Sequence, residues 1–380
     1  MIEIEKYKSG QFLQSTSGYK YFLPVKINDF WKWDDPIINR LLENAAIKLG
    51  ELNSFSKLVP NIDLFIQLHV AKEAVVSSRI EGTQTQIDEA LMDEEEVLPE
   101  RRNDWKEVNN YIKAINFAVD ELKTLPISTR LIKKTHAIIL DSVRGEHKQP
   151  GEFRKSQNWI GGNNPANAIF VPPSHEYVNE LMDDMEKFIH NEKIYLPELI
   201  KIAIAHYQFE TIHPFLDGNG RIGRLLITLF FVDKKILTKP LLYLSTYFEK
   251  NKHIYYDKLT NVRTKKDIKQ WLKYFLVGIA ETSDKATETL SDVISLKNRM
   301  EDIIHTKFGR KSNKANILLN YLFKQPVIYV NKIKEITELS YKAANELLAD
   351  FVKENILEET TGRSRNRIFV FNKYLDLFQK

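Results

Sequence analysis

Apolar residues recur at steps of three and four positions along most of the chain, a spacing typical of amphipathic α-helices. No repeat of fixed period stands out. The acidic run at 93–100 is interpreted as a solvated loop between helices. The fold is therefore expected to be mainly α. The predicted helices cover residues 39–52, 63–80, 108–122, 128–143, 178–192, 196–210, 222–235 and 267–305.

Strand patterns are scarce. In residues 155–173, KSQNWIGGNNPANAIFVPP, short stretches with apolar or aromatic residues flank a turn-rich centre from Gly161 to Asn167. This arrangement predicts a β-hairpin or an extended flap. An irregular surface loop is the alternative.

The last seventy or so residues follow a different pattern. Three short helices are predicted at 313–325, 330–339 and 340–355, with Ser340 as the N-cap of the third. Residues 356–371 then give two strand-like ends around a basic turn. Helix, helix, helix and a two-stranded wing is the order of a winged-helix domain.

Two roles remain open for this C-terminal region. As a DNA binder, it would place its third helix in the major groove, with Arg363, Arg365 and Arg367 of the wing along the phosphates. However, that helix mixes acidic with basic residues, so its surface is not strongly basic. A protein-binding or dimer-forming wing is the alternative.

Composition narrows the classes of protein. The net charge of +4 over 380 residues argues against a nucleic-acid coat, and the absence of cysteine excludes disulfides and thiolate metal sites. No apolar run approaches the roughly 18 residues of a membrane span. The first ten residues also lack the apolar core of a signal peptide. We expect a soluble, cytoplasmic protein with no membrane partner.

The run from His213 to Arg224, HPFLDGNGRIGR, combines features of a phosphate site. It joins two predicted helices, so its glycines fall at a helix N-terminus, where free N–H groups and the helix dipole favour an anion. Gly218 and Gly220 let backbone amides approach a phosphate closely. Asn219 could add an uncharged donor, because its side chain carries an amide. The run thus predicts an anion-binding nest.

Charged side chains in the same run indicate a polyphosphate. Arg221 and Arg224 are three positions apart on the first turn of the second helix, so they share a face. Asp217 offers a hard oxygen to Mg²⁺, which binds carboxylates together with phosphate oxygens. His213 stands ahead of the nest, where a neutral imidazole can take a proton from a hydroxyl group.

The run also resembles the motif of Fic domain proteins, H-P-F-x-(D/E)-G-N-G-R-x-x-R, at every specified position. The resemblance implies a Fic-type helical bundle that transfers AMP from ATP to a Ser, Thr or Tyr hydroxyl of a target protein. It implies that His213 is the general base and that Asp217 binds Mg²⁺. The implied ATP-binding residues in this run are Asp217, Gly218, Asn219, Gly220, Arg221, Ile222, Gly223 and Arg224.

Two further segments resemble the same family. Residues 136–162 are similar to the segment that leads into the family's flap, the hairpin that clamps the target. An edge strand there could pair with an extended peptide. The resemblance places Tyr255 against the adenine, although packing in the core is the alternative for this tyrosine. The implied flap residues that border the nucleotide are Ile160, Gly161, Gly162 and Asn163.

The segment SSRIEG, at the end of the helix predicted over 63–80, resembles the family's inhibitory motif, (S/T)-x-x-x-E-(G/N), with Ser77, Glu81 and Gly82 in place. The resemblance implies that Glu81 reaches Arg224 and occupies the place of the terminal phosphate. We therefore expect low activity until Glu81 is displaced.

These interpretations predict a magnesium- and ATP-dependent protein adenylyltransferase restrained by Glu81. The alternatives are removal of AMP at the same site, or a nucleotide-sensing regulator whose winged helix binds DNA. Expected partners are ATP, a target protein along the flap, the chain itself as a target or dimer, and DNA. The predicted domains are an inhibitory helical region at 1–103, a Fic catalytic core at 104–285 and a linker helix with the winged-helix domain at 286–380.

Overall fold

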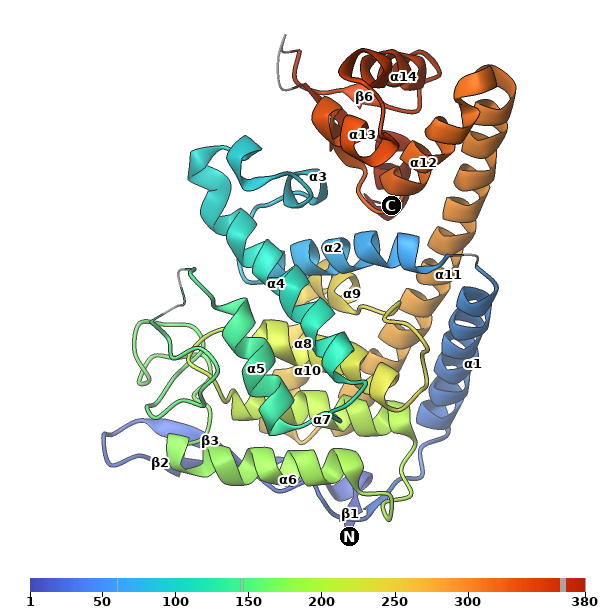
Figure 1. Ribbon diagram of the computed structural model, residues 1–380. Helices are drawn as coiled ribbons and strands as arrows, with labels where there is room; N and C mark the ends of the chain where they lie inside the picture. The colour runs from blue at the N-terminus through green and yellow to red at the C-terminus, as the bar shows by residue number, and fades with distance from the viewer. Residues whose placement is uncertain (60, 144, 146, 363–366, 380) are drawn as a thin grey trace.

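The computed structural model describes residues 1–59, 61–143, 145, 147–362 and 367–379, and it is mainly helical (Figure 1). The helices are α1 Pro36–Leu58, α2 Asp63–Ile80, α3 Ile87–Ala90, α4 Arg102–Glu121, α5 Thr129–Ile139, α6 Val178–His190, α7 Glu198–Ile212, α8 Asn219–Asp233, α9 Ser245–Lys250, α10 Lys252–Lys265, α11 Ile268–Lys307, α12 Ser312–Leu322, α13 Val330–Thr337, α14 Tyr341–Lys353 and α15 Asn372–Gln379. Within the described part of the chain, no helix is long and apolar enough to cross a bilayer.

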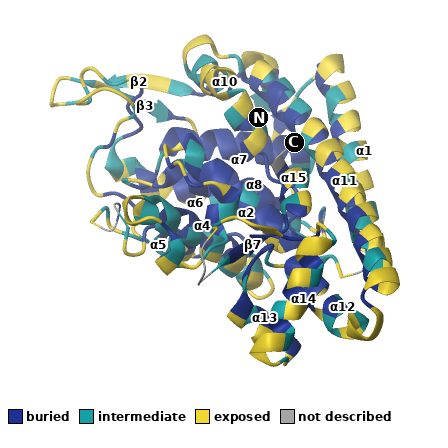
Figure 2. Ribbon diagram, turned by 90° about the horizontal axis from the view of Figure 1, so that it is seen from above, coloured by how far each residue is buried: buried dark blue, intermediate teal, exposed yellow. Residues whose placement is uncertain are grey.

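Helices α7 and α8 form the centre of the bundle. Every residue of α7 from Leu199 to Ile212 is buried, and α8 is buried from Arg221 to Phe231 (Figure 2). A helix that is apolar on all sides is stable only when neighbours surround it. The loop between these two helices, which holds residues 213–218, is therefore set between two deeply buried helices.

His206 connects this centre to its neighbours. Its ring lies among Phe248, Trp271 and Phe275, with centroids between 5.8 and 6.2 Å away. Nδ1 lies 2.8 Å from the carbonyl of Gly223, and Nε2 lies 3.0 Å from the hydroxyl of Tyr255. A neutral ring that donates from Nδ1 and accepts at Nε2 satisfies both contacts. Burial lowers the pKa of His206 to about 3, which keeps the ring neutral.

Helix α11 is a single element of 40 residues that lies beside α1 and continues to the C-terminal region (Figure 1). The domain boundary predicted after residue 285 falls inside α11, and the boundary predicted after residue 103 falls inside α4. No break in the helices marks either position. The division into three domains stays a prediction.

The N-terminal region forms a β-hairpin that the sequence reasoning did not predict. It consists of β2 Gly10–Gln14 and β3 Lys20–Pro24, paired antiparallel with Phe12 opposite Phe22. A short parallel pair, β1 Ile2–Glu3 with β4 Trp31–Lys32, lies nearby in the sequence. The available signals were two short runs of aromatic and aliphatic residues, FL at 12–13 and YFL at 21–23, on either side of the Ser-Gly turn at Gly18.

The flap predicted at 155–173 contains one antiparallel bridge, between Ile160 and Phe170, within turns and bends. It is thus closer to the irregular loop than to a regular hairpin. The flap also contacts the N-terminal hairpin through its second half. The N–H of Phe22 donates to the carbonyl of Val171 at 2.9 Å. The acidic run at 93–100 folds as the 3-10 turns η2 Glu94–Glu96 and η3 Pro99–Arg101, where an open loop was expected.

The C-terminal region runs in the order α12, β5 Val327–Tyr329, α13, α14, β6 Glu358–Glu359, β7 Ile368–Val370 and α15. Its three strands form an antiparallel sheet in the order β5-β7-β6. The Ser340 hydroxyl caps α14 by accepting the N–H of Ala343 at 3.3 Å. This order is the one that a winged helix requires, although β5 and α15 were not expected. The winged-helix assignment stays a prediction.

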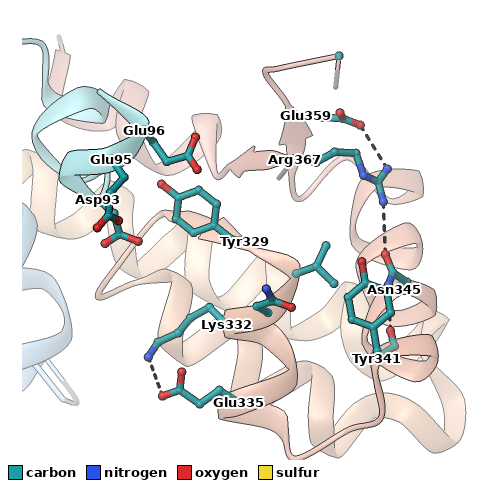
Figure 3. A pocket seen from close by; sticks show the side chains of 13 residues that line it. Asp93, Glu95, Glu96, Tyr329, Lys332, Glu335, Tyr341, Asn345, Glu359 and Arg367 are labelled. Carbon is teal, nitrogen blue, oxygen red and sulfur yellow. Dashed lines mark hydrogen bonds and ion pairs between the residues drawn. The ribbon is translucent and has the colours of Figure 1, made fainter. Parts of the chain in front are cut away.

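A groove of about 960 Å³ lies between this region and the acidic turn of residues 93–96 (Figure 3). Five carboxylates and two basic side chains line it, so its field disfavours a phosphate backbone. Arg367, expected to follow phosphates, instead lies 3.4 Å from Glu359 and 3.3 Å from Asn345. The other two arginines expected there, Arg363 and Arg365, lie outside the described residues. DNA binding stays a prediction.

The buried neutral His206 predicts a defined pH effect on stability. Its pKa is lower in the folded chain than the ordinary 6.5, so below pH 6.5 the unfolded state takes up a proton that the folded state does not. Between pH 7.5 and 5.5 the stability advantage of the wild type over His206→Gln should shrink by about 1.4 kcal/mol. Urea unfolding of both proteins at the two pH values measures this change. A constant difference would contradict the neutral assignment.

Candidate active site

The loop between α7 and α8 turns sharply at both of its ends. His213 ends α7 in the left-handed region, with φ 49° and ψ 62°, and its N–H donates to the carbonyl of Phe209 at 2.9 Å. Gly218 precedes α8 with φ 73°, a conformation that favours glycine. The imidazole of His213 therefore lies at the C-terminal end of α7. The N-terminus of α8, with its unpaired N–H groups, follows it closely.

Two side chains that the sequence reasoning did not identify hold the backbone of His213. The Nε of Arg154 and the Nδ2 of Asn158 both donate to the carbonyl of His213, at 3.0 and 3.1 Å. Asn158 also donates to the carbonyl of Phe215 at 2.8 Å. Both residues are buried in the segment that leads into the flap. Both lie in the segment 136–162 that resembles the family, but the sequence reasoning gave neither residue a role.

The buried His136 on α5 supports the other end of the loop. Its Nδ1 accepts the N–H of Gly151 at 2.9 Å, so its Nε2 carries the proton and donates to the carbonyl of Asp217 at 3.0 Å. Its ring stacks on Phe215 with centroids 3.7 Å apart. Burial lowers the pKa of His136 to about 4, and the neutral tautomer is thereby kept. His136 begins the segment 136–162 that resembles the family, but the sequence reasoning gave it no role of its own.

The imidazole of His213 is neutral near pH 7. Burial lowers its pKa to about 4, and the guanidinium of Arg154 acts in the same direction, while Glu81 opposes both. A neutral ring can accept a proton, whereas an imidazolium cannot. The geometry therefore suits the role of general base.

The first turn of α8 provides free amides. The first intrahelical bond runs from the N–H of Ile222 to the carbonyl of Gly218 at 3.1 Å. The N–H groups of Asn219, Gly220 and Arg221 precede this bond, so the helix gives them no acceptor, and no side chain of the described residues caps this end. This is the nest that the sequence predicts, and it can bind an anion.

The side chain of Asn219 does not take the role expected for it. Its Oδ1 accepts the N–H of Phe215 at 2.8 Å, and its Nδ2 donates to the carbonyl of Phe215 at 2.9 Å. Asn219 is also buried, with an exposed fraction of 2%. Its amide therefore fastens the loop, because Oδ1 and one hydrogen of Nδ2 already bond the backbone of Phe215.

Arg224 is a buried guanidinium held by the inhibitory segment. Its Nε donates to the hydroxyl of Ser77 at 2.8 Å, and one terminal nitrogen donates to the carbonyl of Ser77 at 2.9 Å. The same nitrogen lies 2.7 Å from Oε1 of Glu81. Burial acts to lower the pKa of Arg224, but the carboxylate of Glu81 outweighs it and raises the pKa. The structure thus joins Ser77, Glu81 and Arg224, as the resemblance implies.

Glu81 also covers the nest. A Cβ added to Gly220 would lie 2.3 Å from Oε1 of Glu81, so the carboxylate sits directly against the first turn of α8. Gly82, which follows, has φ 112° and lets the chain leave α2 at this point. Burial acts to raise the pKa of Glu81, but Arg224 holds it below the usual range, so the carboxylate is ionised.

Arg221 takes different partners from Arg224. One of its terminal nitrogens lies 3.6 Å from Glu107 on α4, and the other lies 3.7 Å from Asp217. The hydroxyl of Tyr111 donates to the Arg221 carbonyl at 3.0 Å. The two arginines, expected to share a face of the helix, are both buried, and their side chains take partners from different helices, Arg221 from α4 and Arg224 from α2.

Asp217 fits the donor chemistry of a Mg²⁺ site only in part. Its carboxylate is 47% exposed, and Oδ1 accepts the N–H of Gly218 at 2.6 Å. Among the described residues, no group of three or more His, Asp or Glu side chains could hold a metal ion. A magnesium ion would depend on one carboxylate and on the oxygens of a bound polyphosphate, which is how it commonly binds nucleotides.

The resemblance places Tyr255 against the adenine, but the structure shows the alternative, a tyrosine packed in the core. The tyrosine has an exposed fraction of 1%, and its ring packs on Phe248 with centroids 4.4 Å apart. It belongs to the His206 cluster, which leaves no free face for a base. The adjacent Tyr256 is 41% exposed, and Glu81 and Arg224 both influence its pKa. Tyr256 is therefore the aromatic residue in reach of the site.

The flap residues are less closely connected with the site. Gly161 and Gly162 have φ near 70°, and Asn163 donates its N–H to Oδ1 of Asn167 at 3.1 Å. Gly161, Gly162 and Asn163 are exposed, and Ile160 pairs with Phe170 inside the flap. No described hydrogen bond joins these four residues to 213–224.

Comparisons with known proteins agree with this geometry. Residues 39–120 match the model of the Fic/DOC family N-terminal region, and residues 126–231 match the model of the Fic/DOC family. The chain therefore contains a Fic domain preceded by the N-terminal region of the same family.

Named relatives share part of the chain. It is 30% identical over 183 residues to Protein adenylyltransferase Fic of Aedes aegypti, an alignment that covers 45% of this chain and 34% of that protein. It is 28% identical over 176 residues to a probable protein adenylyltransferase of Aquifex aeolicus, which covers 46% of this chain and 52% of that protein. The chain thus spans between a third and half of the length of these relatives.

Solved structures share the fold. A Fic family protein from Desulfovibrio desulfuricans aligns with a TM-score of 0.56 at 19% identity, over 89% of this chain and 96% of that chain. A Fic domain containing signaling protein from Bacteroides thetaiotaomicron aligns with a TM-score of 0.55 at 19% identity, over 67% of this chain and 97% of that chain. The mainly helical fold with a Fic core is confirmed.

The observed role of Asn219 predicts a loss of stability when its side chain is removed. Asn219→Ala leaves buried polar groups of Phe215 without these partners, which should lower the free energy of unfolding by about 1–3 kcal/mol. Urea unfolding measures the change. Asn164→Ala is the control, because its side chain also bonds the backbone but on the exposed flap, so its effect should stay within about 0.5 kcal/mol. Equal stability of the two variants would contradict this role.

Proposed function

We propose that the protein transfers AMP from Mg²⁺-bound ATP to a hydroxyl group of a Ser, Thr or Tyr on a target protein, and that Glu81 restrains this reaction. The observation that carries the proposal is the position of the Glu81 carboxylate, 2.7 Å from Arg224 and against the amides at Gly220. An anion of the protein thus occupies the place that a triphosphate would need. The names of the relatives, protein adenylyltransferases, support the same activity.

The reaction follows from the groups in the loop. The target hydroxyl loses its proton to the neutral imidazole of His213 as its oxygen forms a bond to the α-phosphorus. The bond between the α-phosphorus and the bridging oxygen to the β-phosphate breaks, and pyrophosphate leaves. The free amides at the start of α8 stabilise the charge on the α-phosphate, and Arg221 and Arg224 bind the outer phosphates. Asp217 would hold the magnesium ion, which would neutralise phosphate charge.

Inhibition by Glu81 needs no large conformational change. The carboxylate must leave Arg224 before a terminal phosphate can take its place, and a charge-assisted hydrogen bond opposes this exchange by about 1.5–3 kcal/mol. Because the Glu81 side chain is 37% exposed, the lower part of this range applies. The result is a tenfold or greater reduction in productive nucleotide binding.

The first test is the substitution Glu81→Gly. It removes the competing carboxylate, so incorporation of label from α-labelled ATP, into the chain itself or into a cell extract, should rise at least about tenfold. The matched control is Glu338→Gly, because Glu338 is also the C-cap of a helix, but its side chain is 86% exposed in the C-terminal region. Equal labelling by wild type and Glu81→Gly would reject the inhibitory role.

The second test adds His213→Ala to the Glu81→Gly protein. Loss of a positioned general base should reduce label incorporation by about a hundred- to ten-thousandfold. Affinity for ATP, measured by calorimetry, should change little, because the nest and the arginines remain. Labelling that persists in the double variant would contradict the role of His213.

Removal of AMP is the second candidate activity, because the Glu81 carboxylate that faces the nest could position a water molecule. Labelled Glu81→Gly protein, freed of nucleotide and mixed with wild type, distinguishes the two activities. Loss of label that depends on Glu81 would identify hydrolysis as the activity of the wild type. Binding of ATP without either reaction would instead support the nucleotide-sensing alternative.

A further inference from the structure

A second cavity of about 400 Å³ lies between α2, α9, α11 and α15, and it shares no lining residue with the loop 213–224. Its size is that of a pocket for a small molecule. Three of its lining residues, His69, Lys72 and Glu73, follow one another at helical spacing on α2, so they share a face of that helix. The inhibitory helix therefore forms one wall of this cavity.

Buried polar atoms in this cavity have no partner. Among the described residues, Nε2 of His69, Oε2 of Glu73 and the hydroxyl of Tyr243 make no hydrogen bond, and all three residues line the cavity. Their exposed fractions are 8%, 3% and 8%. A buried polar group without a partner is costly, and each such group calls for an explanation. Three that line one cavity indicate a polar ligand.

The charge of the cavity favours an anion. Lysines from three elements of the chain, Lys72, Lys250 and Lys285, line it, against the carboxyl groups of Glu73 and Glu281. Burial lowers the pKa of Lys72, and the nearby Lys285 adds to this effect. Burial also raises the pKa of Glu73 to about 7, so this carboxyl group is partly protonated and can donate a hydrogen bond. Lys285 also lies 3.3 Å from Glu288, so Lys72 and Lys250 provide most of the positive charge that the cavity offers.

The rest of the wall is apolar and aromatic. Tyr247 from α9 and Phe378 from α15 line the cavity together with Leu241 and Ala286. The ring of Phe378 also contacts the ring of His69 edge-on, with centroids 4.8 Å apart. These surfaces suit a flat apolar group next to the anionic one.

We propose that this cavity binds a small organic anion, a phosphomonoester or a carboxylate on a flat apolar group, and that the bound anion strengthens the hold of Glu81 on Arg224. The second part of the proposal rests on the proposed function. The ligand would enter between α2 and α11 and would provide the partners that the buried polar atoms lack.

The connection to the active site runs along α2. Glu73, Ser77 and Glu81 are spaced four residues apart, so they form one stripe that leads from the cavity to the nest. Ser77 accepts the Nε–H of Arg224 at 2.8 Å, and Glu73 accepts the hydroxyl of Ser245 at 2.5 Å. A ligand that binds α2 in its present position favours the state in which Glu81 contacts Arg224, and therefore weakens ATP binding.

Binding is tested with phenyl phosphate and benzoate as probes, by calorimetry on the full chain. At least one probe should bind wild type, and Lys72→Gln should weaken it at least about tenfold, since a hydrogen bond to a charged group is lost. Lys113→Gln on the exposed surface of α4 is the matched control and should bind as wild type does. Ala286→Leu, which fills the cavity from α11, should also block binding. No binding, or binding unchanged by Lys72→Gln and Ala286→Leu, would overturn the proposal.

The coupling has a separate readout. A saturating probe should lower the affinity of wild type for Mg·ATP about fivefold or more, and it should leave the affinity of Glu81→Gly unchanged. An equal reduction in both proteins would show that the probe competes in the nucleotide site, which overturns the proposal. The binding measurements require no AMP transfer, so failure of the proposed function is distinguishable from failure of this one.

Discussion

The ion pair between Arg224 and Glu81 is the interaction on which the site depends. The guanidinium of Arg224 is 2% exposed and lies next to the unpaired amides of α8, so this part of the protein concentrates positive charge away from water. A buried cation without a partner is strongly unfavourable. In the proposed function, the anion next to Arg224 changes from the carboxylate of Glu81 to a phosphate of the nucleotide.

The surrounding structure holds the loop between α7 and α8 in place. Helices α7 and α8 are buried on all sides, and the loop between them is held by Arg154, Asn158 and His136. Under the proposed function, these contacts hold the nest in place, and a phosphate binds there only after the Glu81 carboxylate has left. Gly220 belongs to the same constraint, because any side chain there would meet Oε1 of Glu81.

The sequence predicted the bundle well, because burial of apolar faces decides where helices form. The α2 helix was predicted with the bounds that are observed, and the nest was predicted from glycines and charges that lie next to one another. Side chains that act through the backbone of distant residues were not predicted, since Arg154 and His136 meet the loop only after the chain has folded. The placement of Tyr255 against the adenine was wrong for a related reason, because local sequence does not tell which of two adjacent tyrosines faces inward.

The hydrogen bond from Phe22 of β3 to Val171 of the flap affects how an extended polypeptide could pair with the flap. The segment at Phe170 and Val171 is flanked by Ile160 on one side and by Phe22 on the other, so both of its edges are occupied within the described chain. Trp159, which precedes Ile160 on the other side of this bridge, has an exposed fraction of 39%. If a target polypeptide pairs with the flap as proposed, the N-terminal hairpin excludes it from the edge at Val171 that Phe22 already occupies.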